Sequence, residues 1–316
     1  MSYKKKILIS ASPFCEHDKT PLHLLRSSNI KYNLNPKKRK LKEREILKLI
    51  KSYDGLIADV EPLNKKVLST AKNLKIISRV GIGVDNIDLE YTKKNKIVVT
   101  NTPDAPTAAV IELNLGLIFS LIRNVPLHNI EIKKRKWNRH FGLRIPFLKI
   151  GIIGLGRVGL GLANNLLKLG SKNIFYNDLF KKKTKKNITF KPKNYIFKNC
   201  DVVCVALPET IKTKNILNKN VFKIMKKKSF LINTSRGGLI NENHLYDFLK
   251  KGHFLGVALD VFNNEPYKGK LIEFERCILT PHIASHTIDS RNRMELEATK
   301  DLINFFNKKK ITNKVN

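Results

Sequence analysis

Three segments in the second half of the chain each place an ionisable side chain directly after a short apolar run. They are residues 233–238 with Arg236, residues 259–266 with Glu265, and residues 279–285 with His282. Oxidation of an alcohol needs a base for the hydroxyl proton and a cation for a substrate carboxylate or carbonyl. A histidine beside a carboxylate meets the first need near neutral pH. These residue types together suit hydride chemistry.

Each of these side chains also has a purely structural interpretation. Arg236 suits a surface ion pair, although a strand end followed by two glycines is an unusual place for one. Glu265, which precedes a proline, suits the start of a turn. His282 and His286 lie four residues apart, as helical metal ligands do, but Pro281 places His282 before the helix.

A glycine-rich turn precedes the three polar segments. Residues 149–159 run from an apolar stretch into GxGxxG, and residues 160–169 have a helical pattern. In such a turn Gly154 allows the tight bend, Gly156 lets the backbone approach a pyrophosphate, and Gly159 lets helix and strand pack closely. The helix N-terminus adds amide donors and a positive dipole end. The pattern predicts a dinucleotide site.

A carboxylate about 20 residues further on, at the end of the next strand, would bind the adenosine ribose. Asp178 holds this place, and no arginine follows it. We therefore expect NAD as the cofactor. Three alternatives remain open: Asn177 takes the ribose position, the lysines at 181–183 accommodate the 2′-phosphate of NADP, or Asp178 only caps the following segment.

The elements that must position these residues alternate between short apolar runs and amphipathic stretches. This alternation is typical of strand–helix units and a parallel sheet, so the predicted class is α/β. Two series of strands are expected, the first at 7–10, 55–58, 75–80 and 97–100, and the second at 149–153, 173–177, 201–206, 229–234, 254–260 and 277–279.

The stretch between the two series has a different pattern. Residues 108–123 are apolar on almost all sides, as a buried helix would be, and residues 125–137 predict a basic helix on the outside. The last helical stretch, residues 285–307, follows the second series of strands. We expect it to cross back to the first domain.

The composition, with 42% hydrophobic and 28% charged residues, is that of a water-soluble globular protein. No apolar run reaches the roughly 18 residues of a membrane-spanning helix, and the first apolar stretch is too short for a signal peptide. We therefore expect a cytoplasmic protein without a membrane partner. The four cysteines include no CxxC pair, so no metal is expected.

The formal net charge of +35 raises the alternative of nucleic-acid binding. The lysine clusters are short, scattered along the chain and not interleaved with aromatic residues; they lie at 37–40, 133–136, 181–183, 226–228 and 308–310. This distribution is typical of solvated lysine-rich faces. We expect no specific nucleic-acid partner.

Taken together, these motifs resemble those of the D-isomer-specific 2-hydroxyacid dehydrogenases, and most of all the short-type D-3-phosphoglycerate dehydrogenases. The resemblance covers nearly the whole chain. Besides the segments above, RVGIGVDNID at residues 79–88 resembles the family's substrate loop, and NTPD at residues 101–104 with Glu112 resembles its interdomain helix. Four motifs in the family's order argue against a chance match.

The resemblance implies a flavodoxin-like substrate domain, residues 1–101 and 285–316, interrupted by a Rossmann NAD-binding domain, residues 102–284. The latter includes the interdomain helices within residues 105–137. Because these helices form a two-fold interface in the family, a homodimer is expected. No serine-sensing regulatory domain is expected after Asn316.

By the same resemblance, Arg236 binds the substrate carboxylate and polarises the C2 oxygen, His282 shuttles the proton, and Glu265 holds His282 and favours its charged form. Amides of Ile82 and Gly83 would hold the carboxylate. The cofactor residues that the resemblance adds to the three glycines and Asp178 are Arg157 and Val158 at the pyrophosphate, Asp260 at the nicotinamide carboxamide, and Thr234.

The substrate that the resemblance favours is 3-phosphoglycerate or 3-phosphohydroxypyruvate, a step of serine biosynthesis. Arg79, at the end of a predicted strand, is expected to reach the distal phosphate; the alternative is that it pairs with a nearby carboxylate such as Asp85. Glyoxylate or hydroxypyruvate reductases and D-lactate-type dehydrogenases remain alternatives within the family. A dinucleotide-sensing corepressor or scaffold is the alternative from another class, but it would have no chemical need for all three ionisable residues.

Overall fold

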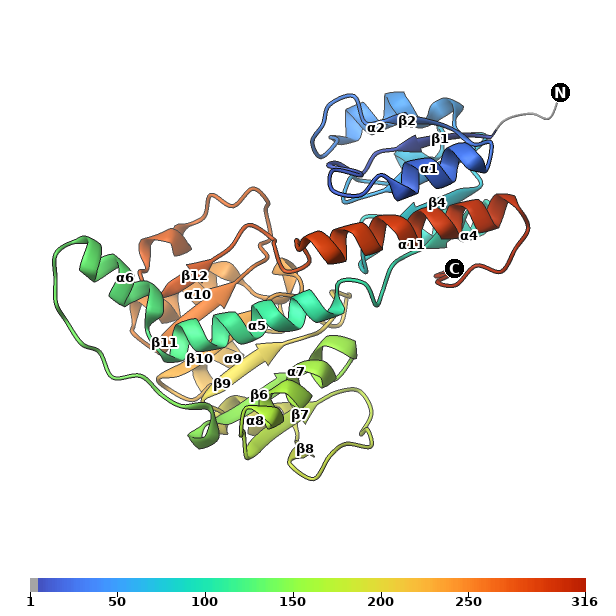
Figure 1. Ribbon diagram of the computed structural model, residues 1–316. Helices are drawn as coiled ribbons and strands as arrows, with labels where there is room; N and C mark the ends of the chain where they lie inside the picture. The colour runs from blue at the N-terminus through green and yellow to red at the C-terminus, as the bar shows by residue number, and fades with distance from the viewer. Residues whose placement is uncertain (1–4) are drawn as a thin grey trace. The chain divides into compact units, whose positions relative to one another are not determined.

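The structure is a computed structural model of the chain that describes residues 5–316 (Figure 1). The chain forms two compact units, one of residues up to 106 together with 287–316, and the other of residues 107–286. The predicted domains changed at 101/102 and 284/285, close to these limits. Residues 1–4 of the predicted first domain lie outside the described residues. That the first unit binds substrate stays a prediction.

The first unit is a parallel sheet of five strands in the order β2-β1-β3-β4-β5. This order is that of the flavodoxin-like fold, as predicted. The strands are β1 (Lys6–Ile9), β2 (Lys31–Leu34), β3 (Gly55–Ala58), β4 (Ile76–Arg79) and β5 (Val98–Thr100). The prediction missed β2, an edge strand with no buried residue, because a strand without a buried face has no apolar alternation to detect.

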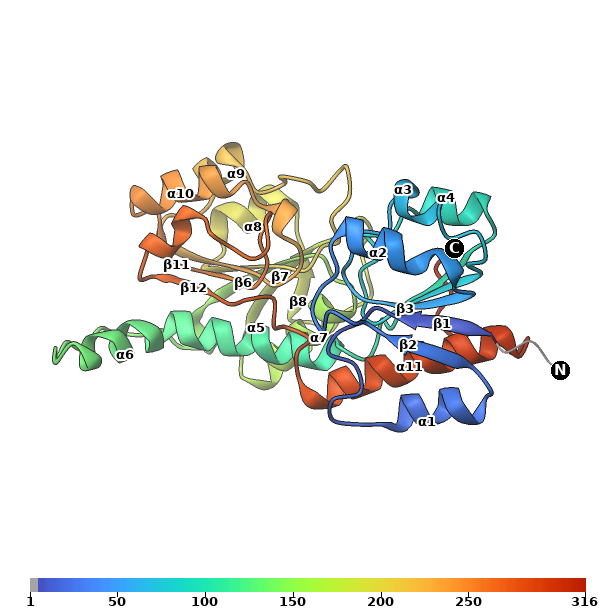
Figure 2. The same cartoon turned by 90° about the horizontal axis from the view of Figure 1, so that it is seen from above.

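Helices cover both faces of this sheet (Figure 2). Successive side chains of a strand point to opposite faces, so Leu8 packs under one layer while Ile7 and Ile9 pack under the other. One layer is α2 (Glu43–Leu49), α3 (Lys65–Leu68) and α4 (Leu89–Lys94), and the other is α1 (Thr20–Ser27) and α11 (Ile288–Phe306). The last helix therefore belongs to the first unit, as expected, but it begins after Thr287, whose side chain accepts a hydrogen bond from the Ser290 N–H.

The second unit is a parallel sheet of seven strands in the order β12-β11-β10-β9-β6-β7-β8. Read from β6, this is the doubly wound order of a Rossmann domain with one further strand, as predicted. The strands are β6 (Lys149–Ile153), β7 (Asn173–Asn177), β8 (Ile188–Phe190), β9 (Val202–Val205), β10 (Ser229–Asn233), β11 (Phe254–Leu259) and β12 (Cys277–Leu279). The prediction missed β8, an edge strand of three residues with only Ile188 buried.

Two layers of helices also cover this sheet (Figure 2). They are α5 (Thr107–Ile122) and α7 (Arg157–Lys168) on one face, and α8 (Lys193–Asn199), α9 (Lys219–Ile224) and α10 (Glu242–Lys250) on the other. The helix predicted at 160–169 begins three residues earlier, at Arg157, because Gly156 is its N-cap. The glycine turn and the start of the helix are therefore one continuous element.

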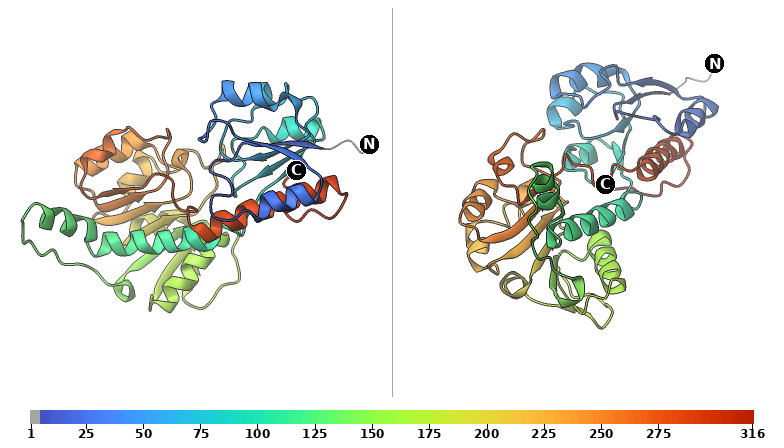
Figure 3. Two further views of the ribbon diagram at one scale, coloured as in Figure 1. Left: turned by 45° about the horizontal axis from the view of Figure 1, so that its top comes forward. Right: turned by 60° about the vertical axis from the view of Figure 1, so that its left-hand side comes forward.

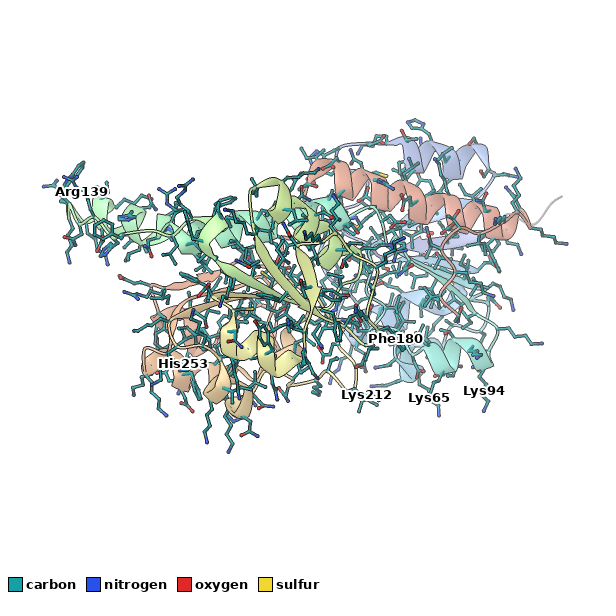
Figure 4. All side chains as sticks on the ribbon, turned by 90° about the horizontal axis from the view of Figure 1, so that it is seen from below. Lys65, Lys94, Arg139, Phe180, Lys212 and His253 are labelled. Atoms are coloured by element: carbon teal, nitrogen blue, oxygen red, sulfur yellow. The ribbon has the colours of Figure 1, made fainter. Side chains whose placement is uncertain are left out.

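The helix α6 (Val125–Lys133) and the loop after it form an arm that projects from the second unit (Figure 3). No residue of α6 is buried, which confirms the expected outer position. Its predicted end at Trp137 is wrong: Arg135 adopts a left-handed φ of 58°, which terminates the helix. Arg139 lies at the tip of the arm (Figure 4).

Among residues 5–316, no single helix has the length and apolar character needed to cross a membrane. The pair α5 and α6, bent by 60°, reaches that length and composition only when the two helices are taken together.

Candidate active site

The second unit brings two of the three predicted catalytic side chains into direct contact. His282 Nδ1 lies 3.0 Å from Glu265 Oε2, and the other oxygen of Glu265 accepts a hydrogen bond from the Phe262 N–H at 3.2 Å. Both side chains are about one-third exposed, 39% for His282 and 33% for Glu265. The carboxylate fixes the orientation of the ring, which leaves Nε2 for proton transfer.

The loop that carries His282 is held by a buried carboxylate, Asp260. Its Oδ1 accepts hydrogen bonds from Thr280 Oγ1 at 2.6 Å and the Ile283 N–H at 2.8 Å, and its Oδ2 accepts one from the Ala284 N–H at 2.9 Å. The His282 N–H donates to the Asp260 carbonyl at 2.8 Å. His282 itself has a left-handed φ of 56°, a strained conformation for a non-glycine residue that persists only when its surroundings fix it. Asp260 supplies that restraint.

Arg236 follows β10 on a turn organised by Asn233. The Asn233 side chain donates to the Arg236 carbonyl at 2.8 Å and accepts from the Ser235 N–H at 3.0 Å. Arg236 Nη1 donates to the Ser235 carbonyl at 2.7 Å. At Gly237 a Cβ would overlap the backbone of residues 262 and 263, so only glycine allows this turn to pack against the segment leading to Glu265. Gly237 thus allows the turn that carries Arg236 to pack directly against the segment that leads to Glu265.

The glycine turn has the form that a dinucleotide needs. Gly154 has φ 97°, and a Cβ there would overlap the Ala206 carbonyl, while one at Gly159 would overlap the Gly154 carbonyl. A Cβ at Gly156, by contrast, would meet no heavy atom within 4 Å. Open space therefore lies at the N-terminus of α7, where amides and the helix dipole favour an anion. Arg157 and Val158 form the first turn of that helix, exposed and half-buried respectively.

Asp178, at the end of β7, faces this glycine turn. Its Oδ2 accepts a hydrogen bond from the Leu155 N–H at 2.9 Å, and its Oδ1 accepts one from the Leu179 N–H at 2.7 Å. The amide of Asn177 instead points to the neighbouring strand and donates to the Lys191 carbonyl at 2.9 Å. Of the two candidates for the ribose position, Asp178 is therefore the one whose side chain contacts the turn.

Thr234 lies at the end of β10, buried, where its hydroxyl accepts a hydrogen bond from Asn114 Nδ2 at 2.7 Å.

Among the described residues no group of three His, Cys, Asp or Glu side chains is arranged to hold a metal ion. The four cysteines have free thiols, and burial raises the pKa of each to about 12.

The predicted substrate residues lie in the first unit: Arg79 is the last residue of β4, and Ile82 and Gly83 lie on the loop after it. Thr102 anchors this loop: its hydroxyl accepts from the Gly81 N–H at 2.8 Å and its own N–H donates to the Gly81 carbonyl at 3.0 Å. Asn101 donates to the Ile82 carbonyl at 2.8 Å. Ile82 is exposed and Gly83 half-buried.

Arg79 is less accessible than its predicted role suggests. Its side chain is 9% exposed, lies 3.3 Å from Asp59 Oδ1 and also donates to the Val80 carbonyl. A Cβ on Gly81, which has φ 138°, would press against the guanidinium, so Arg79 lies directly beneath the loop. The role of Asp59 gave no signal in the sequence, because it lies 20 residues away on the neighbouring strand end.

Comparison with known proteins agrees with these features. Residues 115–284 match the family model of the D-isomer specific 2-hydroxyacid dehydrogenase, NAD binding domain. The chain is 34% identical to a glyoxylate reductase of Pyrococcus horikoshii over 83% of each chain. It is also 34% identical to a D-3-phosphoglycerate dehydrogenase of Methanocaldococcus jannaschii over 79% of this chain but only 49% of that protein.

Among solved structures, the D-lactate dehydrogenase from Aquifex aeolicus complexed with NAD and lactic acid superposes with a TM-score of 0.86. It is 25% identical and covers 96% of each chain. The family model covers more than half of the chain, and the P. horikoshii relative matches most of it. The chain therefore belongs to the D-isomer-specific 2-hydroxyacid dehydrogenases, enzymes with an NAD-binding domain.

Proposed function

We propose that this dehydrogenase acts on 3-phosphoglycerate and 3-phosphohydroxypyruvate, the D-2-hydroxy acid and 2-keto acid favoured by its substrate loop. The 3.0 Å contact between His282 and Glu265 is the observation that carries the reaction type, because it provides an oriented proton carrier. The reaction would serve serine biosynthesis in a cytoplasmic setting.

The proposed chemistry assigns one task to each ionisable residue. Arg236 binds the substrate carboxylate and polarises the C2 oxygen. During oxidation His282 Nε2 takes the hydroxyl proton, and the Glu265 carboxylate stabilises the imidazolium that forms. The bound nicotinamide supplies the acceptor for the hydride that leaves C2. In the reverse direction the proton returns from Nε2 to the carbonyl oxygen.

The residues that we propose to contact the cofactor all lie in the second unit. Amides at the start of α7, with Arg157 and Val158, would hold the pyrophosphate, and Asp178 would accept the ribose hydroxyls. Thr234 and Asp260 would lie toward the nicotinamide. The open space at Gly156 supports this assignment, because a side chain there would occupy it.

A phosphorylated substrate is supported by the sequence of the loop at residues 79–88 and by the cationic character of Arg79. A guanidinium facing a dianion adds charge-assisted hydrogen bonds, and the strongly positive protein field raises the rate of capture. Similarity to a D-3-phosphoglycerate dehydrogenase adds further support, although the chain spans about half the length of that relative.

Glyoxylate or hydroxypyruvate reduction is the second candidate function. The pairing of Arg79 with Asp59 favours it, since the carboxylate already neutralises part of the cationic charge. The relative matched over 83% of its own length is a glyoxylate reductase. In that case Ile82 and Gly83 would hold the carboxylate of a smaller acid.

The deciding measurement is the ratio of kcat/KM for phosphohydroxypyruvate to that for hydroxypyruvate, in the wild type and in Arg79→Ala. A charged contact with the phosphate is worth roughly 1.5 to 3 kcal/mol, so its loss should reduce the ratio by about tenfold or more. Lys75→Ala, which removes an equal charge before the same strand, is the control and should leave the ratio unchanged. A wild-type ratio below one would transfer the assignment to the second candidate.

We also propose a homodimer formed through α5 and the arm. The arm exposes large apolar side chains, which monomeric proteins rarely cluster on one surface; they include Val125 (54% exposed), Ile132 (53%), Trp137 (78%) and Phe141 (101%).

A further inference from the structure

The segment that follows α11 pairs with β5, the last strand in the order of the first sheet. After α11 the chain turns back (Figure 1), Lys314 forms an antiparallel bridge with Thr100, and the Val315 N–H donates to the Val99 carbonyl at 2.8 Å. Backbone groups on the outer side of an edge strand have no partner within the sheet. Residues 312–316, which we call the clasp, supply such partners to β5.

Asn316 fixes the far end of the clasp through its side chain. Its Oδ1 accepts a hydrogen bond from the Val99 N–H at 2.8 Å, and its Nδ2 donates to the Thr92 hydroxyl and to the Ile97 carbonyl, each at 2.9 Å. Thr92 lies in α4, so one short side chain joins the clasp to the last strand and to a helix that covers the sheet. These three hydrogen bonds hold the clasp in one position along β5.

Asn101 connects the clasp to the predicted substrate loop. Its N–H donates to the Asn313 carbonyl at 3.2 Å, and its side chain donates to the Ile82 carbonyl at 2.8 Å. The clasp therefore holds the backbone of Asn101, and the amide of Asn101 holds the loop. All of these residues belong to the first unit.

The Ile82 carbonyl and the Gly83 N–H belong to the same peptide group. This peptide is trans and planar, so its N–H and its carbonyl point in opposite directions. The hydrogen bond from Asn101 thereby sets the direction of the Gly83 N–H. Rotation of this peptide is otherwise easy, because Gly83 has no Cβ to restrict its φ.

We propose that the clasp is a positioning element for the substrate: by holding Asn101, it fixes the peptide between Ile82 and Gly83 and so sets the affinity for the substrate carboxylate. This role rests on the proposed function, because it requires these amides to bind the carboxylate. Every 2-hydroxy or 2-keto acid carries that carboxylate. The effect should therefore be the same for phosphohydroxypyruvate and for hydroxypyruvate.

The first test compares Asn316→Ala with the matched change Asn307→Ala, at an exposed residue just before the clasp. Asn316→Ala should raise the KM of both acids about threefold, because a looser Asn101 leaves the Gly83 N–H misdirected part of the time. The kcat should stay within about twofold, as when only binding is lost, and the NADH dissociation constant should not change. Asn307→Ala should alter none of these values.

Asn101→Ala separates positioning from a general loss of stability. It removes the donor to the Ile82 carbonyl and should raise the KM about fivefold, the effect of one hydrogen bond. If the clasp acts through Asn101, adding Asn316→Ala leaves the rise at about fivefold, whereas independent changes would multiply to roughly fifteenfold. Circular dichroism on heating verifies that each variant is folded at the assay temperature. A purely structural role of the clasp would lower the Tm and the active fraction, and hence kcat, without raising the KM.

Hydrogen exchange gives a readout that does not depend on turnover. The amides of Gly81, Asn101 and Thr102 are hydrogen-bonded in and beside the substrate loop. In Asn316→Ala they should exchange about threefold faster, because the loop opens more often. The amides of the glycine turn at residues 154–159, in the second unit, should exchange as in the wild type.

Unchanged exchange in Asn316→Ala, or KM effects of Asn316→Ala and Asn101→Ala that multiply, would overturn the role of the clasp. Faster exchange with an unchanged KM would show that Ile82 and Gly83 do not hold the carboxylate, and the effect on affinity would fall with that assignment. A wild type that reduces neither acid would overturn the proposed function, while the exchange result would still decide whether the clasp positions the loop.

Discussion

Two histidine–glutamate pairs occur in the same unit, and their shortest nitrogen–oxygen distances are nearly equal. His282 lies 3.0 Å from Glu265, and His140 Nε2 lies 2.9 Å from Glu131. The two histidines are equally exposed, at 39%. In the arm pair, the His140 and Asn138 contacts lower the pKa of Glu131. Judged by distance and exposure alone, both pairs are candidates for proton transfer.

The surroundings of the two pairs differ. His282 follows β12, an edge strand of the sheet, and the buried Asp260 fixes its loop through three hydrogen bonds. His140 lies on the loop after α6, where its ring neighbour is another histidine, His128, at 5.3 Å. We therefore propose that a histidine–carboxylate contact can serve catalysis only where rigid elements also hold it in place, as they hold His282.

Replacing each histidine in turn gives the largest contrast. His282→Ala should reduce kcat by about 100- to 10,000-fold, because it removes the proton carrier. His140→Ala, the matched control, should leave kcat within about twofold, since the arm pair has no part in the chemistry. Steady-state assays at 340 nm check both, and nicotinamide fluorescence should show unchanged NADH binding. A His282→Ala enzyme that retains more than about a tenth of the wild-type rate would contradict the proposed difference in function between the two histidine–glutamate pairs.

The restraint on the His282 loop is tested by Asp260→Asn. An amide cannot accept all three hydrogen bonds as a carboxylate does, and losing a buried charge-assisted bond costs roughly 1.5 to 3 kcal/mol of unfolding free energy. We expect a lower Tm and a fall in kcat. The control is Asp247→Asn on the exposed side of α10, which should change Tm by little. If both variants melted like the wild type, Asp260 would not be what fixes His282.

The smallest effect concerns the arm, which we expect to form a dimer interface. Light scattering at micromolar concentration should give the mass of two chains, and Trp137→Ser with Phe141→Ser should shift the protein toward one chain, because apolar area is lost from the interface. Replacing the exposed Leu179 and Phe180 by serine is the control and should leave the mass unchanged. A monomeric wild type would contradict the proposed interface.

Several features could be predicted from local sequence because their physical cause is local. The bend at Gly154, the open space at Gly156 and the close packing at Gly159 each follow from the absence of a side chain. Buried central strands were found because their apolar runs are continuous. The edge strands β2 and β8 were missed, since they bury few side chains and leave little periodic signal.

The sequence by itself determined which residue types are available for the chemistry, namely Arg236, Glu265 and His282. It also determined the order along the chain of the strands that precede them. Only the tertiary structure decided what each polar group contacts. Asp260 binds the His282 loop from 20 or more residues away, and Asp59 meets Arg79 from a neighbouring strand end. Such contacts depend on which strands lie side by side and in what register, and strand neighbours follow from packing of the whole sheet rather than from any local pattern.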